Sequence, residues 1–381
     1  MRICFVVADV RAQQGTFTGI YLAWAAHRRG HDVRFVSVDD LSFLDDNNIL
    51  AQTTRVRAGD YTDPAAYAHA LSSDEAVVEE DALGIFDVVF LRYNPTREGE
   101  GRPGAPLIDF GWRLRLAGTL VINDPEGMRR AGSRMYLADF PADVRTRTLV
   151  SRSKTRLKAF LKALDGPAVL KPLAPRGGEH VFYLRRRQVS NLNQMITAVT
   201  KQGYALAQEY LPDGDQGEKR LLLLNAEPLR VGDRVAIYRR RPARSGAESN
   251  GSSGRAGTKT GKVGNVGNVG NVGITGKSAK PGRSSPPATS LRGRCDFGPV
   301  EARICDILRP RLLADGLTFV SVDLVGDRIL ELNVFTPGGL HAVAELYGVD
   351  AAEVVIADLE RRVRLRAAYR TTFDPEAADV V

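Results

Sequence analysis

The segment from Thr318 to Leu340, TFVSVDLVGDRILELNVFTPGGL, sets two short apolar runs on either side of a glycine-containing turn. This pattern is typical of a β-hairpin. Asp323 interrupts the first run, and Glu331 and Asn333 interrupt the second, although strand propensity disfavours all three. Oxygen-bearing side chains in half-buried strands need partners, and a hard cation with phosphate oxygens is a suitable one.

The length of the turn decides whether these three side chains meet. Glu331 and Asn333 are two residues apart, so they share one face of their strand. A three-residue turn over 326–328 would set Asp323 directly opposite Glu331, whereas a two-residue turn would put them on opposite faces. The alternative is an exposed hairpin whose polar residues face water. The choice between a cation site and an exposed hairpin depends on the motifs in the rest of the chain.

Length and composition are those of an ordinary globular protein. The 381 residues are enough for two or three lobes with a substantial core. The hydrophobic fraction of 43% is typical of soluble proteins, and no apolar run approaches the length of a membrane span. Cys4, Cys295 and Cys305 lack the spacing of a zinc site or a disulfide framework, which favours a reducing cytoplasm.

The net charge of +8 is concentrated in one segment. Between Arg239 and Arg294 there are twelve Lys or Arg residues and one acidic residue, Glu248, so the rest of the chain is close to neutral. Nucleic acid is therefore disfavoured as a partner. Residues 244–294 have very few large apolar side chains and carry a Gly-Asn-Val repeat over 264–272, so this segment is predicted to be a disordered insert.

Strand and helix patterns alternate through the rest of the chain. The N-terminal part reads as a βαβ-type domain, with strands over 2–10, 31–38, 86–93 and 119–123 and helices over 17–29 and 107–116. No GxGxxG follows the first strand, so a dinucleotide is not indicated. From residue 124 the pattern is α+β, with helices over 127–140, 153–164, 299–314 and 351–368 and strands over 168–173, 180–184, 204–211 and 219–225.

Three groups of residues in this second part suit a nucleotide. Lys171 ends an apolar strand, and the Gly-Gly pair at 177–178 could bring backbone N–H groups against phosphates. The strand end over 208–211 suits a backbone edge that reads adenine. Glu218 and Arg220 offer a carboxylate for ribose hydroxyls and a guanidinium for a phosphoryl group. The ordinary interpretations are a surface lysine, an edge strand and a surface ion pair.

Five motifs follow one another along the chain. They are Lys-Pro at 171–172, a Gly-Gly loop, Gln-Glu-Tyr-Leu-Pro at 208–212, Glu-Lys-Arg at 218–220 and Asp-x7-Glu-x-Asn from Asp323. Asn-Asp-Pro at 123–125 and Leu-Arg-Tyr-Asn-Pro at 91–95 accompany them. This order resembles the ATP-grasp ligases, and within them the bacterial glutathione synthetase family. The resemblance covers nearly the whole chain outside the insert.

The resemblance implies a particular domain organisation. An N-terminal βαβ (pre-ATP-grasp) domain would occupy 1–123, followed by a two-lobed α+β ATP-grasp domain with ATP between its lobes. The expected boundaries are 124–204 for the first lobe, 205–243 and 295–370 for the second, 244–294 for the insert and 371–381 for a C-terminal tail.

The resemblance also implies a role for each matching residue. Asp323, Glu331 and Asn333 would bind magnesium, with manganese as a substitute, and Arg220 would lie at the transferring phosphoryl group. The residues implied to bind ATP are Arg134, Lys171, Gly177, Gly178, Gln208, Glu209, Tyr210, Leu211 and Glu218. Those implied to contact substrate are Arg92, Arg240, Gly338 and Gly339, with Arg92 on a carboxylate.

The implied reaction joins γ-glutamylcysteine to glycine. ATP converts a carboxylate into an acyl phosphate, an amine attacks it, and ADP and phosphate are released. Magnesium and cationic side chains neutralise the moving charge, so no protein nucleophile is required. The sequence leaves the acceptor amine and the oligomeric state open, with a homo-oligomer among the options.

Three departures from the family pattern keep alternatives open. Arg134 stands where a lysine is usual, and Ala-Pro-Arg at 174–176 replaces the usual Asp-Gly. The Arg-x-Asn expected in a substrate loop after Arg241 is missing, and Glu-Ser-Asn at 248–250 is the nearest counterpart. The alternatives are a related ligase for another peptide or amino acid and a nucleotide-binding relative without turnover.

Overall fold

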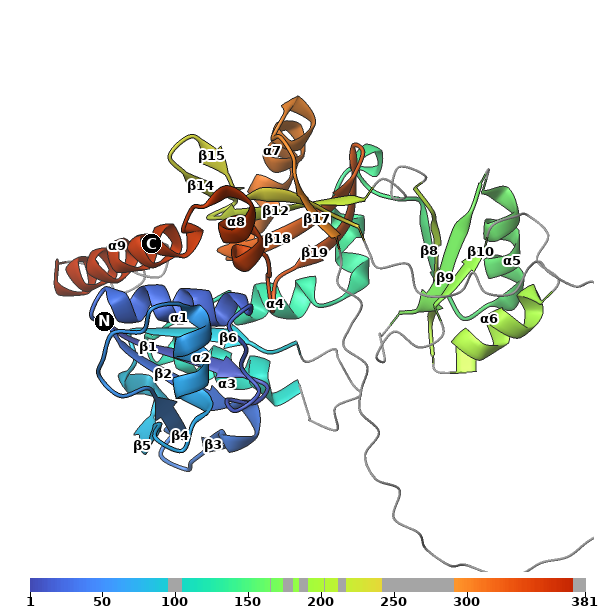
Figure 1. Cartoon of the computed structure of the whole chain (residues 1–381). Coiled ribbons are helices and arrows are strands. Elements are labelled where there is room, and N and C mark those ends of the chain that lie inside the picture. Colours follow the sequence, from blue (N-terminus) through green and yellow to red (C-terminus); the bar gives the residue numbers. More distant parts are fainter. Residues whose placement is uncertain are drawn as a thin grey trace, which may run out of the picture.

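The structure is a computed structural model that describes residues 1–94, 105–164, 166–173, 181–184, 191–201, 203–211, 217–241 and 291–372. Figure 1 shows an N-terminal unit, a large C-terminal sheet next to it, and a four-stranded unit set to one side. The Gly-Gly pair at 177–178 lies outside the described residues, as do most of the insert and of the C-terminal tail. The predictions for those segments are therefore untested.

The N-terminal unit is a seven-stranded sheet around the predicted parallel βαβ core. In that core β1 (Arg2–Val7) lies between β2 (Asp32–Ser37) and β6 (Val88–Arg92), and β6 pairs with β7 (Leu120–Ile122). Antiparallel strands that were not predicted extend the sheet: β3 (Ser42–Phe43), β4 (Ile49–Arg55) and β5 (Val77–Ala82). The helices are α1 (Thr18–Arg28), α2 (Pro64–Ser72) and α3 (Ala105–Leu116), with short 3₁₀ turns η1 (Val38–Asp40) and η2 (Leu83–Ile85).

A row of phenylalanines fixes the register of the parallel core. Phe5 on β1 is directly opposite Phe35 on β2 and Phe90 on β6, and all three are buried. The rings stack, with centroids 5.1 Å apart for Phe5–Phe35 and 4.8 Å apart for Phe5–Phe90. A shift of one residue would turn these rings to the other face of the sheet, so their burial specifies the register.

The four-stranded unit is antiparallel, in the order β10-β9-β11-β8. Its strands are β8 (Thr148–Ser151), β9 (Ala168–Pro172), β10 (Phe182–Leu184) and β11 (Ala205–Glu209), and its helices are α5 (Lys154–Ala163) and α6 (Leu192–Lys201). The Ser153 hydroxyl accepts a hydrogen bond from the N–H of Arg156, which confirms the predicted cap. Because β11 pairs with β8 and β9, the expected lobe boundary at residue 204 is wrong, and this sheet extends through residue 209.

The segment between β7 and β8 packs against the C-terminal sheet. The helix predicted over 127–140 is two pieces, α4 (Pro125–Ala131) and the 3₁₀ helix η3 (Arg134–Asp139), followed by η4 (Ala142–Val144). Ser133 caps η3 through the N–H of Met135, and Gly132 lies against the ring of Phe335. These pieces join the core of the C-terminal sheet, so the first lobe begins near β8 and not at residue 124.

The C-terminal sheet follows the order β17-β16-β12-β18-β19. Its strands are β12 (Glu218–Leu224), β16 (Ile237–Arg241), β17 (Leu291–Arg294), β18 (Phe319–Val325) and β19 (Arg328–Asn333), with β13 (Glu227–Pro228) beside β12. β14 (Arg230–Val231) and β15 (Arg234–Val235) form a small ribbon, and the helices are α7 (Pro299–Ala314), α8 (Leu340–Tyr347) and α9 (Ala351–Thr372). Residues 291–294 were predicted to be disordered, but they form an edge strand on β16, so that end of the insert is corrected.

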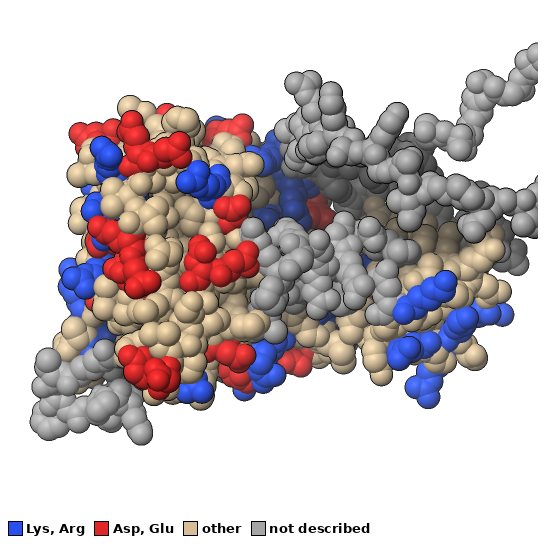
Figure 2. Space-filling model, turned by 90° about the horizontal axis from the view of Figure 1, so that it is seen from below, with Lys and Arg blue, Asp and Glu red and all other residues tan. Residues whose placement is uncertain are grey.

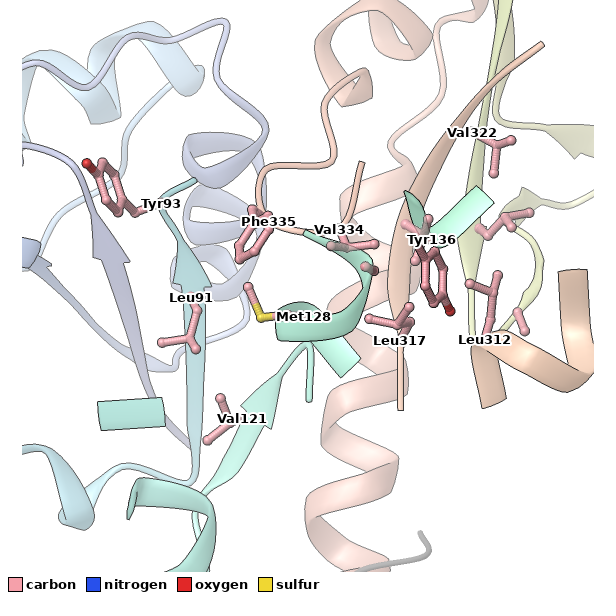
Figure 3. Close-up of a cluster of buried hydrophobic side chains, with 14 of the residues drawn as sticks. Leu91, Tyr93, Val121, Met128, Tyr136, Leu312, Leu317, Val322, Val334 and Phe335 are labelled. Atoms are coloured by element: carbon pink, nitrogen blue, oxygen red, sulfur yellow. The ribbon is translucent and has the colours of Figure 1, made fainter. Parts of the chain in front are cut away.

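The N-terminal unit and the C-terminal sheet share one hydrophobic core. Figure 3 shows it running from Leu91 and Val121 through Met128 and Phe335 toward Val334 and Val322. α9 adds a second contact, because it returns to lie along α1. The N-terminal unit and the C-terminal sheet with its helices are therefore joined at two places.

Charges of both signs are interspersed over the N-terminal unit. Figure 2 shows no continuous basic surface there, whereas basic side chains predominate on the visible face of the four-stranded unit. In that unit α5 carries four exposed cations, at positions 154, 156, 158 and 162.

Candidate nucleotide and metal site

The hairpin β18–β19 brings Asp323 directly opposite Glu331, as predicted, but by a different route. The turn contains only two residues, Gly326 and Asp327, and Gly326 has a φ of +58°, which glycine adopts readily. The pairing then shifts by one residue, because Leu324 faces Ile329 while Asp323 faces Glu331. With regular pairing, a two-residue turn would have put Asp323 and Glu331 on opposite faces of the sheet. The extra residue of this β-bulge returns them to the same face.

A polar row crosses four neighbouring strands on one face of the C-terminal sheet. Reading from β16 to β19, directly opposed residues are Tyr238, Arg220, Asp323 and Glu331. On the same face, Glu218 is paired with Arg240 and Ser321 with Asn333. The predicted phosphoryl, ribose and metal residues thus share one surface.

Asp323 is the centre of this surface and is completely buried. Its two carboxylate oxygens accept hydrogen bonds from Arg220 Nε and Nη2, each at 2.7 Å. Arg240 Nη2 donates to Asp323 Oδ2 at 2.7 Å, and Asn333 Nδ2 lies 3.4 Å from the same oxygen. Burial opposes the charge on Arg220, but its hydrogen bonds and ion pair with Asp323 outweigh burial and raise the pKa of Arg220.

Arg240 also bonds to the predicted ribose carboxylate. Its Nε donates to Glu218 Oε2 at 3.0 Å, so one guanidinium links Glu218 to Asp323. Burial raises the pKa of Glu218, although the charge of Arg240 acts in the opposite direction. Sequence reasoning gave Arg240 a substrate role and did not foresee this bridge, because strand pairing distant in sequence creates it.

Asn123 anchors the hairpin that carries the site. Its Nδ2 donates to the carbonyl oxygens of Phe319 at 2.8 Å and Val334 at 2.7 Å, and its Oδ1 accepts from the N–H of Phe319 at 2.7 Å. The first strand of the hairpin begins at Phe319, and the second ends at Asn333. Asn123 therefore ties both strands to the end of β7 and satisfies three buried backbone groups at once.

Lys171 and Arg134 are two cations whose charges interact with each other and with Glu331 of the polar row. Burial, followed by the charge of Arg134, lowers the pKa of Lys171 to about 8, while Glu331 and Glu218 act in the opposite direction. Burial also lowers the pKa of Arg134, with Glu331 opposing. Lys171 Nζ lies 3.3 Å from Gln208 Oε1, and Gln208 in turn donates to the Thr146 hydroxyl. The pair suits an anionic ligand.

The strand that was expected to offer an edge to adenine is an inner strand. β11 lies between β9 and β8, and Gln208 is opposed on both sides, by Val169 and Thr148. Beyond it, the N–H of Glu209 donates to the Arg147 carbonyl at 3.0 Å and that of Tyr210 to the Pro167 carbonyl at 2.9 Å. The edge interpretation is wrong for Gln208, whose side chain instead faces Lys171.

A second group of polar residues adjoins Arg220 at the start of α8. Arg92 Nη2 donates to the Pro337 carbonyl at 3.0 Å, while its buried Nη1 has no hydrogen-bond partner among the described residues. Burial lowers the pKa of Arg92 to about 10. Gly338 lies close to Arg220, and a side chain at Gly339 would collide with the ring of Tyr238. The predicted substrate residues Arg92, Gly338 and Gly339 are therefore neighbours.

Thr18 and Tyr238 belong to this region but were missed from the sequence. The Thr18 hydroxyl accepts a hydrogen bond from the N–H of Gly339 at 3.1 Å, which joins the start of α1 to the start of α8. Tyr238 was discoverable in principle, because it lies two residues before Arg240 and so shares its face of β16. For Thr18 the chain offers no local signal, since its partner is 321 residues away.

The described residues contain no group of three or more His, Cys, Asp or Glu side chains that could hold a metal by themselves. The predicted set is smaller, two carboxylates and one carboxamide. Asp323 is buried, Glu331 is exposed and Asn333 is half-buried, and all three lie on one face. Such a set suits a magnesium ion that takes its remaining oxygens from a phosphate or water.

Comparison with solved structures shows the fold. The structure is similar to that of the ATP-grasp ligase PsnB in complex with a precursor variant, Mg and ADP, with a TM-score of 0.54 over 95% of this chain and 98% of that one, at 14% identity. It is similar to the D-cycloserine synthetase DcsG with the same TM-score, over 94% of this chain and 99% of that one, at 16% identity. The fold is that of the ATP-grasp enzymes, which use ATP with Mg²⁺.

Sequence comparisons identify the family. The model for the prokaryotic glutathione synthetase N-terminal domain matches residues 1–129, and that for the ATP-grasp domain of the same enzymes matches 133–262 and 291–348. Glutathione synthetase of Synechococcus elongatus is 29% identical over 95% of this chain and 99% of its own length. That of Agrobacterium fabrum is 30% identical over 74% and 73%. The chain belongs to the prokaryotic glutathione synthetase family, and it is an ATP-dependent ligase of that type.

The family model also refines the extent of the insert. Its match continues to residue 262 and resumes at 291, so residues 263–290, which contain the whole Gly-Asn-Val repeat, have no counterpart in it. The described helices include none that is both long enough and apolar enough to cross a membrane.

Proposed function

We propose that this ligase joins γ-glutamylcysteine to glycine, with the nucleotide phosphates held between the four-stranded unit and the polar row of the C-terminal sheet. The observation that carries the proposal is the opposition of two sets of charges. Asp323 and Glu331 form the negative set. The buried cations Lys171 and Arg134 form the positive set, and both interact electrostatically with Glu331. A magnesium–phosphate group satisfies both sets at once.

The residues present fit the metal and the nucleotide. Asp323, Glu331 and Asn333 would hold magnesium, which neutralises phosphate charge when bound. Lys171, Arg134 and Arg220 would bind phosphate oxygens, and the Glu218 carboxylate suits ribose hydroxyls. The backbone after Gln208 remains the candidate for adenine.

Arg92 would orient the substrate. Its unpartnered Nη1 is a buried donor next to the Gly338–Gly339 turn, where a carboxylate would satisfy it. The adjoining Arg220 then lies between Arg92 and the metal residues. In this arrangement a substrate carboxylate accepts the phosphoryl group, and the cations stabilise the charge that develops before the amine attacks.

The test is substrate-dependent release of ADP and phosphate. We expect release only when magnesium, ATP, γ-glutamylcysteine and glycine are all present, and formation of AMP and pyrophosphate would contradict the proposal. Asp323→Asn and Glu331→Gln are each expected to lower kcat at least about 100-fold, because each removes an anionic metal ligand. Asp327→Asn, in the exposed turn of the same hairpin, is the matched control and should retain wild-type turnover.

A further inference from the structure

The carboxylates of the proposed nucleotide and metal site are paired with cationic side chains of the chain itself. The buried carboxylate of Asp323 accepts three hydrogen bonds of 2.7 Å from two guanidinium groups, those of Arg220 and Arg240. The second carboxylate of the nucleotide site, Glu218, is bound by the same Arg240. Two positive charges therefore occupy the surface that a divalent cation has to use.

A divalent cation cannot simply be added to this arrangement. Coordination by Asp323 would bring a doubly charged ion within a few ångströms of both guanidinium groups in a buried setting, where repulsion between like charges is strong. The ion would also find few protein ligands, since the described residues provide two carboxylates and a carboxamide here. Without nucleotide, the repulsion by the two guanidinium groups therefore opposes metal binding, and the protein provides only a few of the oxygen ligands.

Phosphate groups remove both obstacles. Their oxygens are good hydrogen-bond acceptors for guanidinium groups, so they can take Arg220 and Arg240 away from Asp323. The same oxygens complete the coordination of the metal. Ribose hydroxyls can replace Arg240 at Glu218. Nucleotide binding therefore exchanges one set of partners for another, without leaving a buried charge unpaired.

Arg240 is better placed for this exchange than Arg220. Arg220 is directly opposite Asp323 on the adjacent strand and holds it with two parallel bonds. Arg240 reaches Asp323 from the next strand, β16, by a single bond, and its side chain is 29% exposed against 14% for Arg220. It is also the group that touches both carboxylates, so its release opens the ribose and metal positions together.

We propose that Arg240 is a resident cation that occupies Asp323 and Glu218 until nucleotide arrives, and so makes divalent-cation binding conditional on nucleotide. The inference rests on the proposed function, because it takes Asp323 to be a metal ligand. Arg240 acts here as a positioning residue. Since coupling between two ligands is reciprocal, the metal must strengthen nucleotide binding by the same factor.

The experiment measures binding of Mn²⁺ by the loss of the free-ion electron paramagnetic resonance signal, with and without ADP. For the wild-type protein we expect Mn²⁺ to bind at least about tenfold more tightly when ADP is present. Arg240→Met is expected to strengthen binding of Mn²⁺ alone about fivefold to tenfold and to weaken its dependence on ADP by the same factor. Arg240→Lys, which keeps the charge, should restore most of that dependence.

Two controls and four outcomes decide the matter. Arg239→Met removes the neighbouring cation on the opposite face of β16 and should behave as wild type, and circular dichroism should show that every variant is folded. Equal Mn²⁺ affinity of the wild type with and without ADP overturns the inference, as does an Arg240→Met variant with unchanged affinity for Mn²⁺ alone. If Mn²⁺ fails to bind even with ADP, or if Asp323→Asn leaves its binding intact, the metal assignment itself is wrong.

Discussion

At the scale of single residues, the site is defined by charges held in buried positions. Lys171 illustrates this, because its ammonium group has lost most of its contact with water and faces the second cation Arg134. Both effects disfavour the charged amine, and they lower the pKa of Lys171 to about 8. An anionic ligand offsets both effects, so Lys171 is suited to bind an anion such as phosphate.

The lowered pKa of Lys171 predicts a pH dependence of nucleotide binding. Below pH 8 the amine is charged and attracts phosphate, and above pH 8 it becomes neutral, so the affinity for ADP should fall as the pH rises through about 8. Isothermal titration between pH 6.5 and 9.5 measures this. Lys171→Arg retains its charge over that range and should flatten the profile. An equally steep decline in this variant would contradict the assignment.

At the scale of secondary-structure elements, single side chains hold the strands at their positions. The bulge in β18–β19 aligns Asp323 with Glu331, and Asn123 fixes where the hairpin begins and ends. Neither feature touches the proposed ligands. The bulge decides whether Asp323 and Glu331 point to the same face, and Asn123 fixes the position of the hairpin that carries them. The geometry of the proposed site therefore depends on residues outside it.

Replacing Asn123 tests this anchoring. Asn123→Leu leaves the N–H of Phe319 and the carbonyls of Phe319 and Val334 without their partner, and we expect a loss of about 3 kcal/mol or more in the free energy of unfolding. Urea unfolding at constant m-value measures it. Asn193→Leu, on the exposed side of α6, is the control and should cost less than about 0.5 kcal/mol. Similar losses for the two variants would refute the anchoring role.

At the scale of the whole molecule, the two ends of the chain are tied together. Glu360 on α9 accepts hydrogen bonds from Arg29 Nε at 2.8 Å and Nη2 at 2.7 Å, and from His31 Nε2 at 2.8 Å. Arg28 adds ion pairs with Asp350 and Glu353. This network connects α1 to α9 and so joins the N-terminal unit to the C-terminal part of the chain at a second place.

The network predicts a pH-dependent contribution to stability. Hydrogen bonds from Arg29 lower the pKa of Glu360 from 4.5 to about 2, although partial burial acts in the opposite direction. A carboxylate with a lowered pKa stabilises the fold above its unfolded pKa and loses that effect as the pH falls toward the folded value. Glu360→Gln should therefore lower Tm at pH 7 by about 2 °C, and the difference should shrink between pH 4.5 and 2.

Differential scanning calorimetry at several pH values measures how much lower the Tm of Glu360→Gln is than that of the wild type. Asp74→Asn serves as the matched control, because Asp74 makes one highly exposed ion pair with Arg11 and should have no measurable effect on Tm. If Glu360→Gln gave the same difference in Tm at pH 7 and pH 3, the charge of Glu360 would not be the cause.

Most of the elements, and the family, could be predicted from the sequence alone. Apolar periodicity located the parallel core and the helix over 299–314, the Ser153 cap marked the start of α5, and the hairpin with Asp323, Glu331 and Asn333 was recognisable from its residue types. These features are local, since periodicity, capping and turn chemistry depend on residues a few positions apart. The ordered motifs then indicated the ATP-grasp ligases.

Only the tertiary structure decided which of these residues meet. The β-bulge that aligns Asp323 with Glu331, the inner position of β11, the return of residues 291–294 as β17 and the bridge of Arg240 all arise from pairing between strands. Strand register is set by hydrogen bonding and burial across the whole sheet. Strand register cannot be read from residues a few positions apart in the sequence. The sequence therefore identified the chemical groups of the proposed site, and the packing of the sheet determined which of them are neighbours.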